Sequence, residues 1–455
     1  MKEASGGGLR RKENRWLSPL MAANNNEVVL SLRLIKIYQA VDLIDKLRKS
    51  LFVRIFSWSL YDLAVKFFTL NIVSLYFVRW LTITKGAPDI LYSFVFGLSI
   101  LFIAVFSPLL GYFSDMTRRK HALLIQFTIS GIIFTSLLAV TDNIFFAIIF
   151  FICANFSVQI AVIFYNALIV GIAPREKMGF VSGAGKMIGY IGSILALYLI
   201  RPIVDTGGYR ASFLPSAGLF LLFSLPCMLF IRDKGGGGRQ SLLKFISFGE
   251  IKKNLLSLKN SLQSFAASYA IANFFKASFF VLIPLNAIIV FMSVYLTKVY
   301  GLSEGRIIQF LLIGALFAIM GSLLFGFLSD KIGPKLSLYA VFGLWQAGLI
   351  MASLIPADNL VHLTAIVLGV AFGSVWTVSR AMGVKLVPEE RVGEFFGVFA
   401  FIGYVSGMLG PLLWGILAFL LSGLGVIRYR IIVLLFNIFW IIGLFYLRRI
   451  PEKET

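Results

Sequence analysis

The chain has 455 residues and a net charge of +21, and 59% of its residues are hydrophobic while only 14% are charged. Soluble domains carry about a quarter of their residues as charged side chains, so this composition excludes a soluble protein and favours helices that face lipid. The basic residues gather in the tails and in alternate loops. That distribution indicates a signal for membrane orientation rather than a nucleic-acid-binding surface.

Residues 1–52 form a polar, basic segment that we predict to be a cytoplasmic tail. Its first half, 1–26, is rich in Gly, Asn, Arg and Lys and is predicted to be disordered. From about residue 32 to residue 51, apolar and basic side chains alternate at helical spacing, which favours an amphipathic helix on the inner membrane surface. A helix that is merely solvated is the alternative. The tail lacks the pattern of a cleaved signal peptide.

Twelve apolar segments follow, each with the roughly 20 residues needed to cross a hydrocarbon layer about 30 Å thick. Six lie within 53–232 and six within 268–455, and we expect each set to form a bundle. Between them, 233–267 contains four consecutive glycines and then basic residues, which predicts a flexible cytoplasmic linker. Lys and Arg are about four times as frequent on the proposed inner side as on the outer side, so both termini are expected in the cytoplasm.

The segment Gly111–Lys120, between the second and third apolar segments, recurs in similar form later in the chain. It reads Gly-Tyr-Phe-Ser-Asp-Met-Thr-Arg-Arg-Lys, and Gly326–Lys335 reads Gly-Phe-Leu-Ser-Asp-Lys-Ile-Gly-Pro-Lys. We expect each copy to be a tight polar turn between two membrane helices. Glycine permits close approach of the helix ends, and the basic residues keep the turn out of lipid on the cytoplasmic side.

The repeat extends beyond this turn, because five further residues recur 214 positions later. Pro174, Gly179, Gly183, Gly189 and Tyr190 are matched by Pro388, Gly393, Gly397, Gly403 and Tyr404. The chain therefore consists of two related halves. Parallel halves of six spans are a known transporter architecture.

With both turns in view, the paired G-x-x-x-D motifs resemble the signature of the major facilitator superfamily. The resemblance implies an all-α integral membrane protein of the major facilitator fold. Its 12 transmembrane helices would form two six-helix bundles related by pseudo-twofold symmetry.

The resemblance also implies a gate at the cytoplasmic face. The fifth and eleventh helices are expected to begin near Gly179 and Gly393, where unpaired N–H groups make a positive helix end. Asp115 would dock on the eleventh helix and Asp330 on the fifth when the inner mouth is shut. The predicted gate comprises Gly111, Asp115, Arg119, Lys120, Gly326, Asp330, Lys331, Lys335, Gly179, Gly183, Gly393 and Gly397.

Polar side chains inside the spans are candidates for a solute or ion pathway, because lipid penalises them unless a cavity or a partner compensates. Asp62 and Lys66 lie one helical turn apart and form either a structural ion pair or a substrate or proton site. Asn166 and Arg380 occupy equivalent positions in the two halves, either in mid-membrane or near the cytoplasmic mouth. The predicted pathway comprises Tyr61, Asp62, Lys66, Asn155, Gln159, Tyr165, Asn166, Trp376, Ser379 and Arg380.

Several motifs around these positions narrow the resemblance. Tyr61-Asp62-Leu-Ala64, Phe164-Tyr-Asn166-Ala-Leu168, Val181-Ser-Gly183, Ser379-Arg380 and Glu394-Phe-Phe-Gly397 resemble a branch related to the fungal vacuolar amino-acid effluxers. The likeness covers about 55–450. The chain departs from that branch at Val65 and Lys66, where Asn-Ser is usual, and at Trp376, where Gln is common.

No cofactor, metal or nucleotide site is expected. Cys153 and Cys227 lie in apolar spans without a C-x-x-C motif or a nearby His. The segment Gly183-Ala-Gly-Lys186 looks like part of a phosphate loop, but it lacks the earlier glycine and the Ser or Thr after the lysine. Lys186 itself could reach a membrane face.

These patterns predict a secondary active transporter, not an enzyme, that moves a small polar or zwitterionic solute such as an amino acid by alternating access. Transport would be proton-coupled or facilitative, with export suggested by family analogy. The expected setting is a prokaryotic plasma membrane, as a monomer that binds no nucleic acid. The alternatives are an organic-anion carrier and a non-transporting sensor or scaffold. An intramembrane enzyme would need paired carboxylates or a His/Cys set in the spans.

Overall fold

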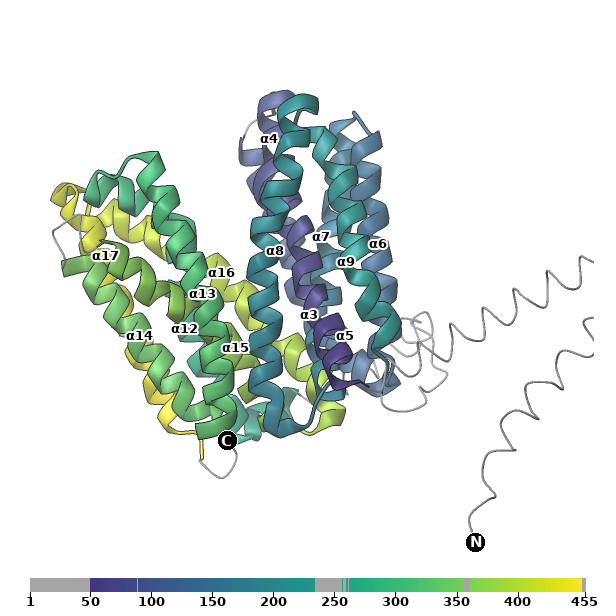
Figure 1. Ribbon diagram of the computed structural model, residues 1–455. Coiled ribbons are helices and arrows are strands. Elements are labelled where there is room, and N and C mark those ends of the chain that lie inside the picture. Colours follow the sequence, from purple (N-terminus) through teal and green to yellow (C-terminus); the bar gives the residue numbers. More distant parts are fainter. Residues whose placement is uncertain are drawn as a thin grey trace, which may run out of the picture. The chain divides into compact units, whose positions relative to one another are not determined.

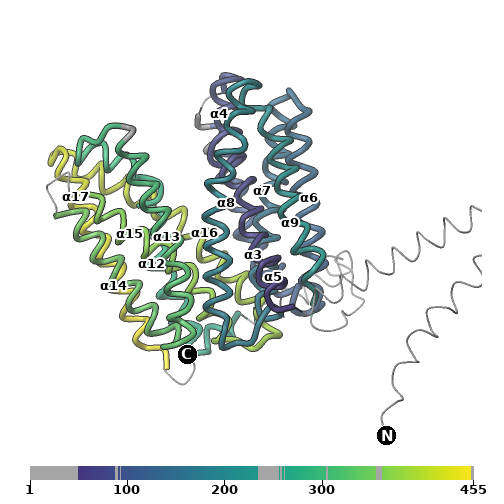
Figure 2. The backbone as a smooth tube through the Cα atoms, viewed as in Figure 1, coloured from purple at the N-terminus to yellow at the C-terminus, as the bar shows by residue number. Residues whose placement is uncertain are grey.

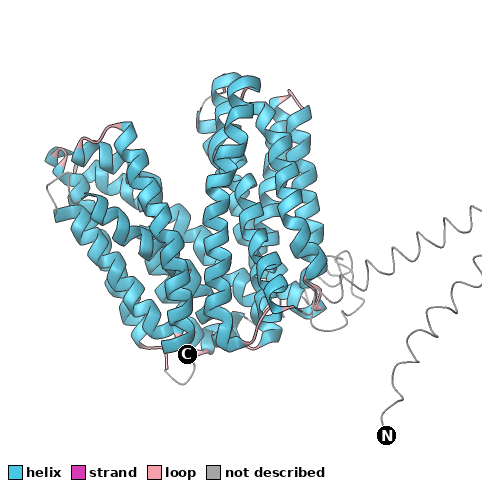
Figure 3. Cartoon of the chain, viewed as in Figure 1, coloured by secondary structure: helices cyan, strands magenta, loops and turns pink. Residues whose placement is uncertain are grey.

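The computed structural model describes residues 50–87, 89–233, 256, 259–260, 262–354 and 361–451. The chain divides into two compact units, Met1–Val53 and Arg54–Thr455, and the second holds all the features described below. The predictions for the N-terminal tail, its amphipathic helix and the glycine-rich part of the linker lie outside the described residues. The described residues are helical, with no strand among them, as Figure 3 shows in cyan.

Twelve helical segments of the described chain are long and apolar enough to cross a membrane. The first six are coloured purple to teal in Figure 1. They are α3 (Leu51–Phe68, continued to Thr84), α5 (Asp89–Thr117), α6 (Lys120–Val140), α7 (Ile144–Ala167), α8 (Met178–Gly207) and α9 (Phe213–Phe230).

The second six helices are coloured green to yellow along the tube in Figure 2. They are α12 (Tyr269–Tyr300), α13 (Glu304–Ile332), α14 (Pro334–Leu354), α15 (Val361–Leu386), α16 (Val392–Leu420) and α17 (Ile427–Arg448). The outward surface of both sets is apolar, with Phe145 66% and Phe419 78% exposed. Side chains of this kind are stable against lipid, and helices satisfy their own backbone hydrogen bonds there. The chain is therefore a multi-pass membrane protein with two six-helix bundles.

Within Arg54–Thr455, the two bundles meet chiefly along two helix pairs, α5 with α16 and α8 with α13, while α15 also packs on α8 and α16 on α7. In Figure 1 the ribbons of the two bundles approach at the end where α17 finishes and diverge toward the other end. The hydrogen bonds between the bundles agree with this picture. Among the described residues, they begin at the helix ends where the bundles approach and extend only as far as Tyr190 and Tyr404. The closed end is the one that carries the duplicated motif.

The duplicated motif is more helical than the sequence suggested. We predicted a polar turn over its whole length, but α5 continues to Thr117 and α13 to Ile332. Only Arg118, which has φ 51°, and Arg119 separate α5 from α6. The last turn of α5 is stabilised by the Thr117 hydroxyl, which donates to the Phe113 carbonyl at 2.8 Å. As a result, each motif aspartate projects from a rigid helix end rather than from a loop.

The first span is irregular in its second half, which sequence periodicity did not indicate. After α3, the chain forms two π-helical stretches, η1 (Thr69–Tyr76) and η2 (Trp80–Thr84), around the short α4 (Phe77–Arg79). Insertions of this type occur frequently at functional sites because they redirect side chains. They lie on the same helix as Asp62, one to several turns beyond it.

Candidate functional site

A cluster of three charges joins the two bundles. Asp62 of α3 lies 3.0 Å from the Lys186 ammonium of α8 through its Oδ2 atom, and 3.5 Å from the Arg380 guanidinium of α15. Asp62 and Arg380 are 7% and 4% exposed. Buried charges are stable only when each has a partner of opposite charge. The cluster therefore fixes the position of α15 relative to α3 and α8.

Glycines of α8 bring Lys186 within reach of Asp62. A Cβ atom at Gly189 would come within 3.1 Å of the Asp62 carboxyl carbon, and one at Gly192 within 2.7 Å of the Leu63 Cα atom. The two helices can therefore touch along this face only because it carries no side chains. Gly189 was noticed in the sequence as part of the repeat, but nothing there connected it with Asp62.

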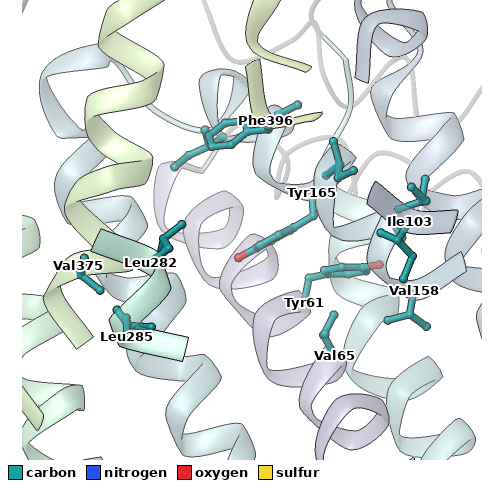
Figure 4. Packing of buried hydrophobic residues seen from close by; sticks show 14 of the residues in the cluster. Tyr61, Val65, Ile103, Val158, Tyr165, Leu282, Leu285, Val375 and Phe396 are labelled. Atoms are coloured by element: carbon teal, nitrogen blue, oxygen red, sulfur yellow. The ribbon is translucent and has the colours of Figure 1, made fainter. Parts of the chain in front are cut away.

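Aromatic rings form one wall of the cluster. Trp58 and Tyr165 stack with ring centroids 4.4 Å apart, and the Trp58 indole N–H donates to the Tyr165 carbonyl at 3.0 Å. Tyr61 stacks on the other face of this group, 5.0 Å from Tyr165. Figure 4 shows the two tyrosine rings one over the other, with hydroxyls pointing in opposite directions. Sequence analysis found both tyrosines but missed Trp58.

The Arg380 guanidinium lies against this wall. Its central carbon is 5.1 Å from the Trp58 ring centroid and 5.5 Å from that of Tyr165. Both distances are within the range of cation–π attraction, which is stronger for a desolvated cation. The rings therefore hold the guanidinium in place independently of Asp62.

Of the two alternatives for Asp62 and Lys66, a structural ion pair or a substrate or proton site, the ion pair is not formed. Among the described residues no ion pair joins the two side chains, although they lie one helical turn apart on α3. Asp62 instead takes its partners from α8 and α15. Lys186, for which we considered a position near a membrane face, is the closest of these partners.

Two predicted pathway residues belong to the hydrogen-bond network of the bundles. Asn155 is fully buried and donates to the Ser99 hydroxyl at 2.8 Å, so it fastens α7 to α5. Gln159 accepts a hydrogen bond from the Tyr404 hydroxyl at 3.2 Å, which crosses from one bundle to the other. Tyr404 is one of the repeated residues.

Among the described residues, no hydrogen bond or ion pair joins the other three predicted pathway residues to the charge cluster. The Asn166 side-chain oxygen is buried and accepts no hydrogen bond within the described chain. Trp376 is half-buried and packs against the hydrophobic core. Ser379 lines a cavity of about 10 Å³ inside the C-terminal bundle, with Phe274 and Ser278.

In the first copy of the motif, three bonds to Asp115 close the end of the bundle interface that carries the motif. Its carboxylate accepts hydrogen bonds from the backbone N–H groups of Gly393, at 3.0 Å, and Glu394, at 2.7 Å. The Lys120 ammonium lies 2.6 Å from the same carboxylate and also donates to the Glu389 carbonyl at 3.2 Å. A negative charge is stabilised there because the first turn of α16 has unpaired N–H groups and a positive dipole end.

The second copy makes the same backbone contact without the lysine. Asp330 accepts hydrogen bonds from the N–H groups of Gly179, at 2.6 Å, and Phe180, at 2.7 Å. Lys335, which corresponds to Lys120, donates instead to the Ile450 carbonyl at 2.6 Å. We name the two arrangements the Asp115 latch and the Asp330 latch.

Two other basic gate residues lie outside these latches. The Lys331 ammonium is 5.8 Å from the Phe327 ring centroid. Arg119 stands at the N-cap of α6, where its side chain forms no cap bond.

Each latch depends on glycines that admit the opposite helix. A Cβ atom at Gly111 would come 2.4 Å from the Gly393 carbonyl oxygen, and one at Gly179 would come 2.3 Å from that of Gly326. Gly183 and Gly397 face backbone oxygens equally closely. These approaches leave no room for a methyl group, so the closed end of the interface requires glycine at these positions.

Further bonds near the latches were missed from the sequence. The Arg175 guanidinium donates to the Val387 carbonyl across the bundles at 3.0 Å. Arg391 is 3.1 Å from the Glu394 carboxylate and donates to the Ser264 hydroxyl at 3.0 Å. We interpreted these arginines only as orientation signals, because loop sequence does not show which carbonyl a guanidinium reaches.

The described residues contain no group of three His, Cys, Asp or Glu side chains that could hold a metal ion. Both cysteines are free thiols.

Comparisons with known proteins agree on one family. The Major Facilitator Superfamily model matches residues 50–411 and, in a second match, 274–455. YxiO, an uncharacterized MFS-type transporter of Bacillus subtilis (strain 168), is 22% identical over 419 residues, or 88% of this chain and 95% of that protein.

Solved structures show the same fold. The proton:xylose symporter XylE aligns with a TM-score of 0.66 at 15% identity, over 89% of this chain and 96% of that one. The human organic anion transporter MFSD10 aligns with a TM-score of 0.67 at 12% identity, over 89% and 99%. Identities this low establish similarity of fold alone.

Proposed function

Because the chain belongs to the major facilitator superfamily, we propose that it is a secondary active transporter that carries a small polar solute by alternating access. The observation that carries this proposal is the pair of latches at one end of the bundle interface. Helix pairs that close at one end through breakable bonds are what a rocking mechanism requires. In this proposal the moving bodies are the bundles 53–232 and 268–455.

The latches would set the balance between inward-open and outward-open states. Each places a carboxylate on a positive helix end, an interaction that contributes about 1–2 kcal/mol when it is partly buried. Opening the inner end removes both contacts. Such a contact shifts the equilibrium only by the difference between its energies in the two states, so two latches can hold the inner end shut without preventing its opening.

The solute would bind beside Asp62, Lys186 and Arg380, because this cluster lies between the bundles and carries charge from both. Two solute classes fit: an amino-acid-like zwitterion, which the sequence resemblance favours, and an organic anion. Asp62 is the candidate for a coupling proton. XylE and MFSD10 carry different cargoes, so similarity of fold does not choose between the classes.

The finer assignments belong to the same proposal. The motifs around Asp62 and Arg380 support a place near the branch of vacuolar amino-acid effluxers, with export as the direction. The excess of basic residues in one set of loops supports cytoplasmic termini and puts the latches on the cytoplasmic side. We expect a monomer in a prokaryotic plasma membrane.

Flux through sealed vesicles tests the proposal. Protein reconstituted into liposomes is expected to move labelled amino acids or organic anions faster than empty liposomes do. The variant Asp115→Asn/Asp330→Asn is expected to change the rate while the solute's affinity changes little. A protein that carries no solute, and whose inner end never opens in either form, would instead be a membrane scaffold or sensor.

A further inference from the structure

We infer that the charge cluster of Asp62, Lys186 and Arg380 is an anion-binding site, so that the cargo is an organic anion rather than a zwitterion or a neutral solute. This inference rests on the proposed transport function and specifies its substrate class. Three features of the cluster favour an anion: its net charge, its unused hydrogen-bond donors and the fixed position of its guanidinium.

The cluster has more positive than negative charge. Two cations, Lys186 and Arg380, share the single carboxylate of Asp62, and the described residues place no second carboxylate within ion-pair distance of either cation. One positive charge therefore remains uncompensated where Arg380 is 4% exposed. Burying an unpaired charge is unfavourable, so the site is most stable when a further anion occupies it.

Counting charges separates the solute classes. With a monoanion bound, two positive and two negative charges are present and the cluster is neutral. A zwitterion or a neutral solute leaves the excess positive charge unchanged, and a cation increases it. Lys66, half-buried one helical turn from Asp62, adds positive charge without pairing with that carboxylate. An anionic cargo is the class that lowers the electrostatic cost of the site.

Three buried polar atoms of the cluster form no regular hydrogen bond. The Arg380 Nη1 atom and the Tyr165 hydroxyl make none within the described chain, and neither does the Asp62 Oδ2 atom, which lies 3.0 Å from the Lys186 ammonium. Tyr165 is 1% exposed, and its ring lies 5.5 Å from the guanidinium. Buried donors are normally satisfied, and those that are not require an explanation. The oxygens of a carboxylate, which accepts several hydrogen bonds and suits a guanidinium, provide one.

The Arg380 guanidinium cannot rotate to find another hydrogen-bond acceptor. It is held by the faces of Trp58 and Tyr165 and by Asp62. Lys186 is the more accessible cation, with 21% of its side chain exposed. An incoming anion can therefore meet Lys186 first and then settle against Arg380.

Chemical rescue tests this inference without knowledge of the natural cargo. Asp62→Asn removes the only carboxylate of the cluster and leaves two cations without a counter-ion. Acetate is expected to raise the melting temperature of purified Asp62→Asn by about 2 °C or more, because a ligand that binds only the folded state stabilises it. Its neutral counterpart, acetamide at equal concentration and ionic strength, is expected to have no such effect.

The rescue must depend on Arg380. The apparent affinity for acetate, obtained from the rise in melting temperature, is expected to be at least tenfold lower in Asp62→Asn/Arg380→Gln than in Asp62→Asn. Lys276→Gln is the matched control in the wild-type background, because Lys276 is exposed and lies over the Tyr446 ring, away from the cluster. It should leave the response to acetate as in the wild type. Equal effects of acetate and acetamide, or rescue that survives the loss of Arg380, would overturn the inference.

If Asp62→Asn does not fold, wild type and Arg380→Gln are compared with the same two compounds. Acetate must then stabilise the wild type and not the variant, and any other result refutes the anion site. The transport proposal has a separate readout in vesicle flux and in opening of the inner end. A protein that carries neutral solutes or zwitterions as readily as anions would keep the transport function and lose the anion site.

Discussion

The two copies of the duplicated motif share their backbone chemistry but differ in how the aspartate is supported. Asp115 meets the first turn of α16 and is neutralised by Lys120 at 2.6 Å. Asp330 meets the first turn of α8 in the same way, but its corresponding lysine, Lys335, turns to the Ile450 carbonyl. Gene duplication preserved the helix-end contact, while the charge around each carboxylate diverged. The two latches should therefore be unequal in strength.

The largest effect is expected where a side chain blocks closure outright. Gly179→Val and Gly393→Val each place a Cβ atom 2.3 Å or less from an atom of the opposite helix. Both should prevent the inner end from closing, and the yield of cross-linking between cysteines introduced across the latches should fall severalfold. The matched control is Gly403→Ala, since no atom lies within 4 Å of the added methyl group. Normal cross-linking in the valine variants would contradict the close packing.

A smaller and unequal effect is expected from the aspartates. Asp115→Asn removes a negative charge that contacts Lys120 and two backbone N–H groups of α16. Asp330→Asn removes a negative charge that contacts only two backbone N–H groups of α8. Each change should favour the open inner end by about five- to thirtyfold, as the loss of a helix-end charge of about 1–2 kcal/mol predicts. Asp115→Asn should have the larger effect, because it also leaves Lys120 unpaired. Opening is measured by the rate at which a cysteine that replaces exposed Met116 reacts with a labelling reagent. Gly111 is unsuitable for this cysteine, because its packing against the opposite helix leaves no room for a side chain.

If the two asparagine variants label alike, Lys120 contributes nothing to the first latch and the proposed inequality is wrong. If only Asp330→Asn labels faster, the order of the two latches is reversed.

The lysines should separate the copies further. Lys120→Gln removes an ion pair and a bond to the Glu389 carbonyl across the bundles, so it should weaken inner closure severalfold. Lys335→Gln removes a bond within the C-terminal bundle and should lower the melting temperature without changing the labelling of Met116. Equal labelling in both variants would show that the two lysines act alike.

The smallest effect is expected at Asp142, in the loop at the opposite end of the N-terminal bundle. Hydrogen bonds from Arg210 and Lys85 hold the pKa of Asp142 below its ordinary value. The resulting stability is present above about pH 4, the ordinary range of an aspartate, and is lost as the pH falls through the lower pKa of the folded state. Asp142→Asn should remove this dependence and leave Met116 labelling unchanged. A change in labelling would mean that this loop is coupled to the latches.

The sequence predicted the features that repeat. Duplicated glycines and aspartates at offsets of 214 and 215 residues predicted the two halves, and the family resemblance implied the helix ends that Asp115 and Asp330 contact. Hydropathy located the spans because lipid acts on every residue of a helix in the same way. The family assignment follows from the same features.

What the sequence could not predict are contacts between residues far apart in the chain. An ion pair between Asp62 and Lys66, one turn away, was one of two alternatives, but Asp62 pairs with Lys186 and Arg380, which only the packing of three helices brings together. The different partners of Lys120 and Lys335 were equally hidden, because both lysines stand five residues after their aspartates. Local spacing gives neighbours on one helix and says nothing about neighbours on another.

The most direct test of the account is the distance between spin labels at Met116 and Lys331, one on each bundle near its latch, in protein whose two native cysteines have been replaced. The account predicts a short distance in the wild type and a growing population at longer distance in Asp115→Asn/Asp330→Asn. An unchanged distance distribution in that double variant would contradict the claim that the two carboxylates hold the inner end shut.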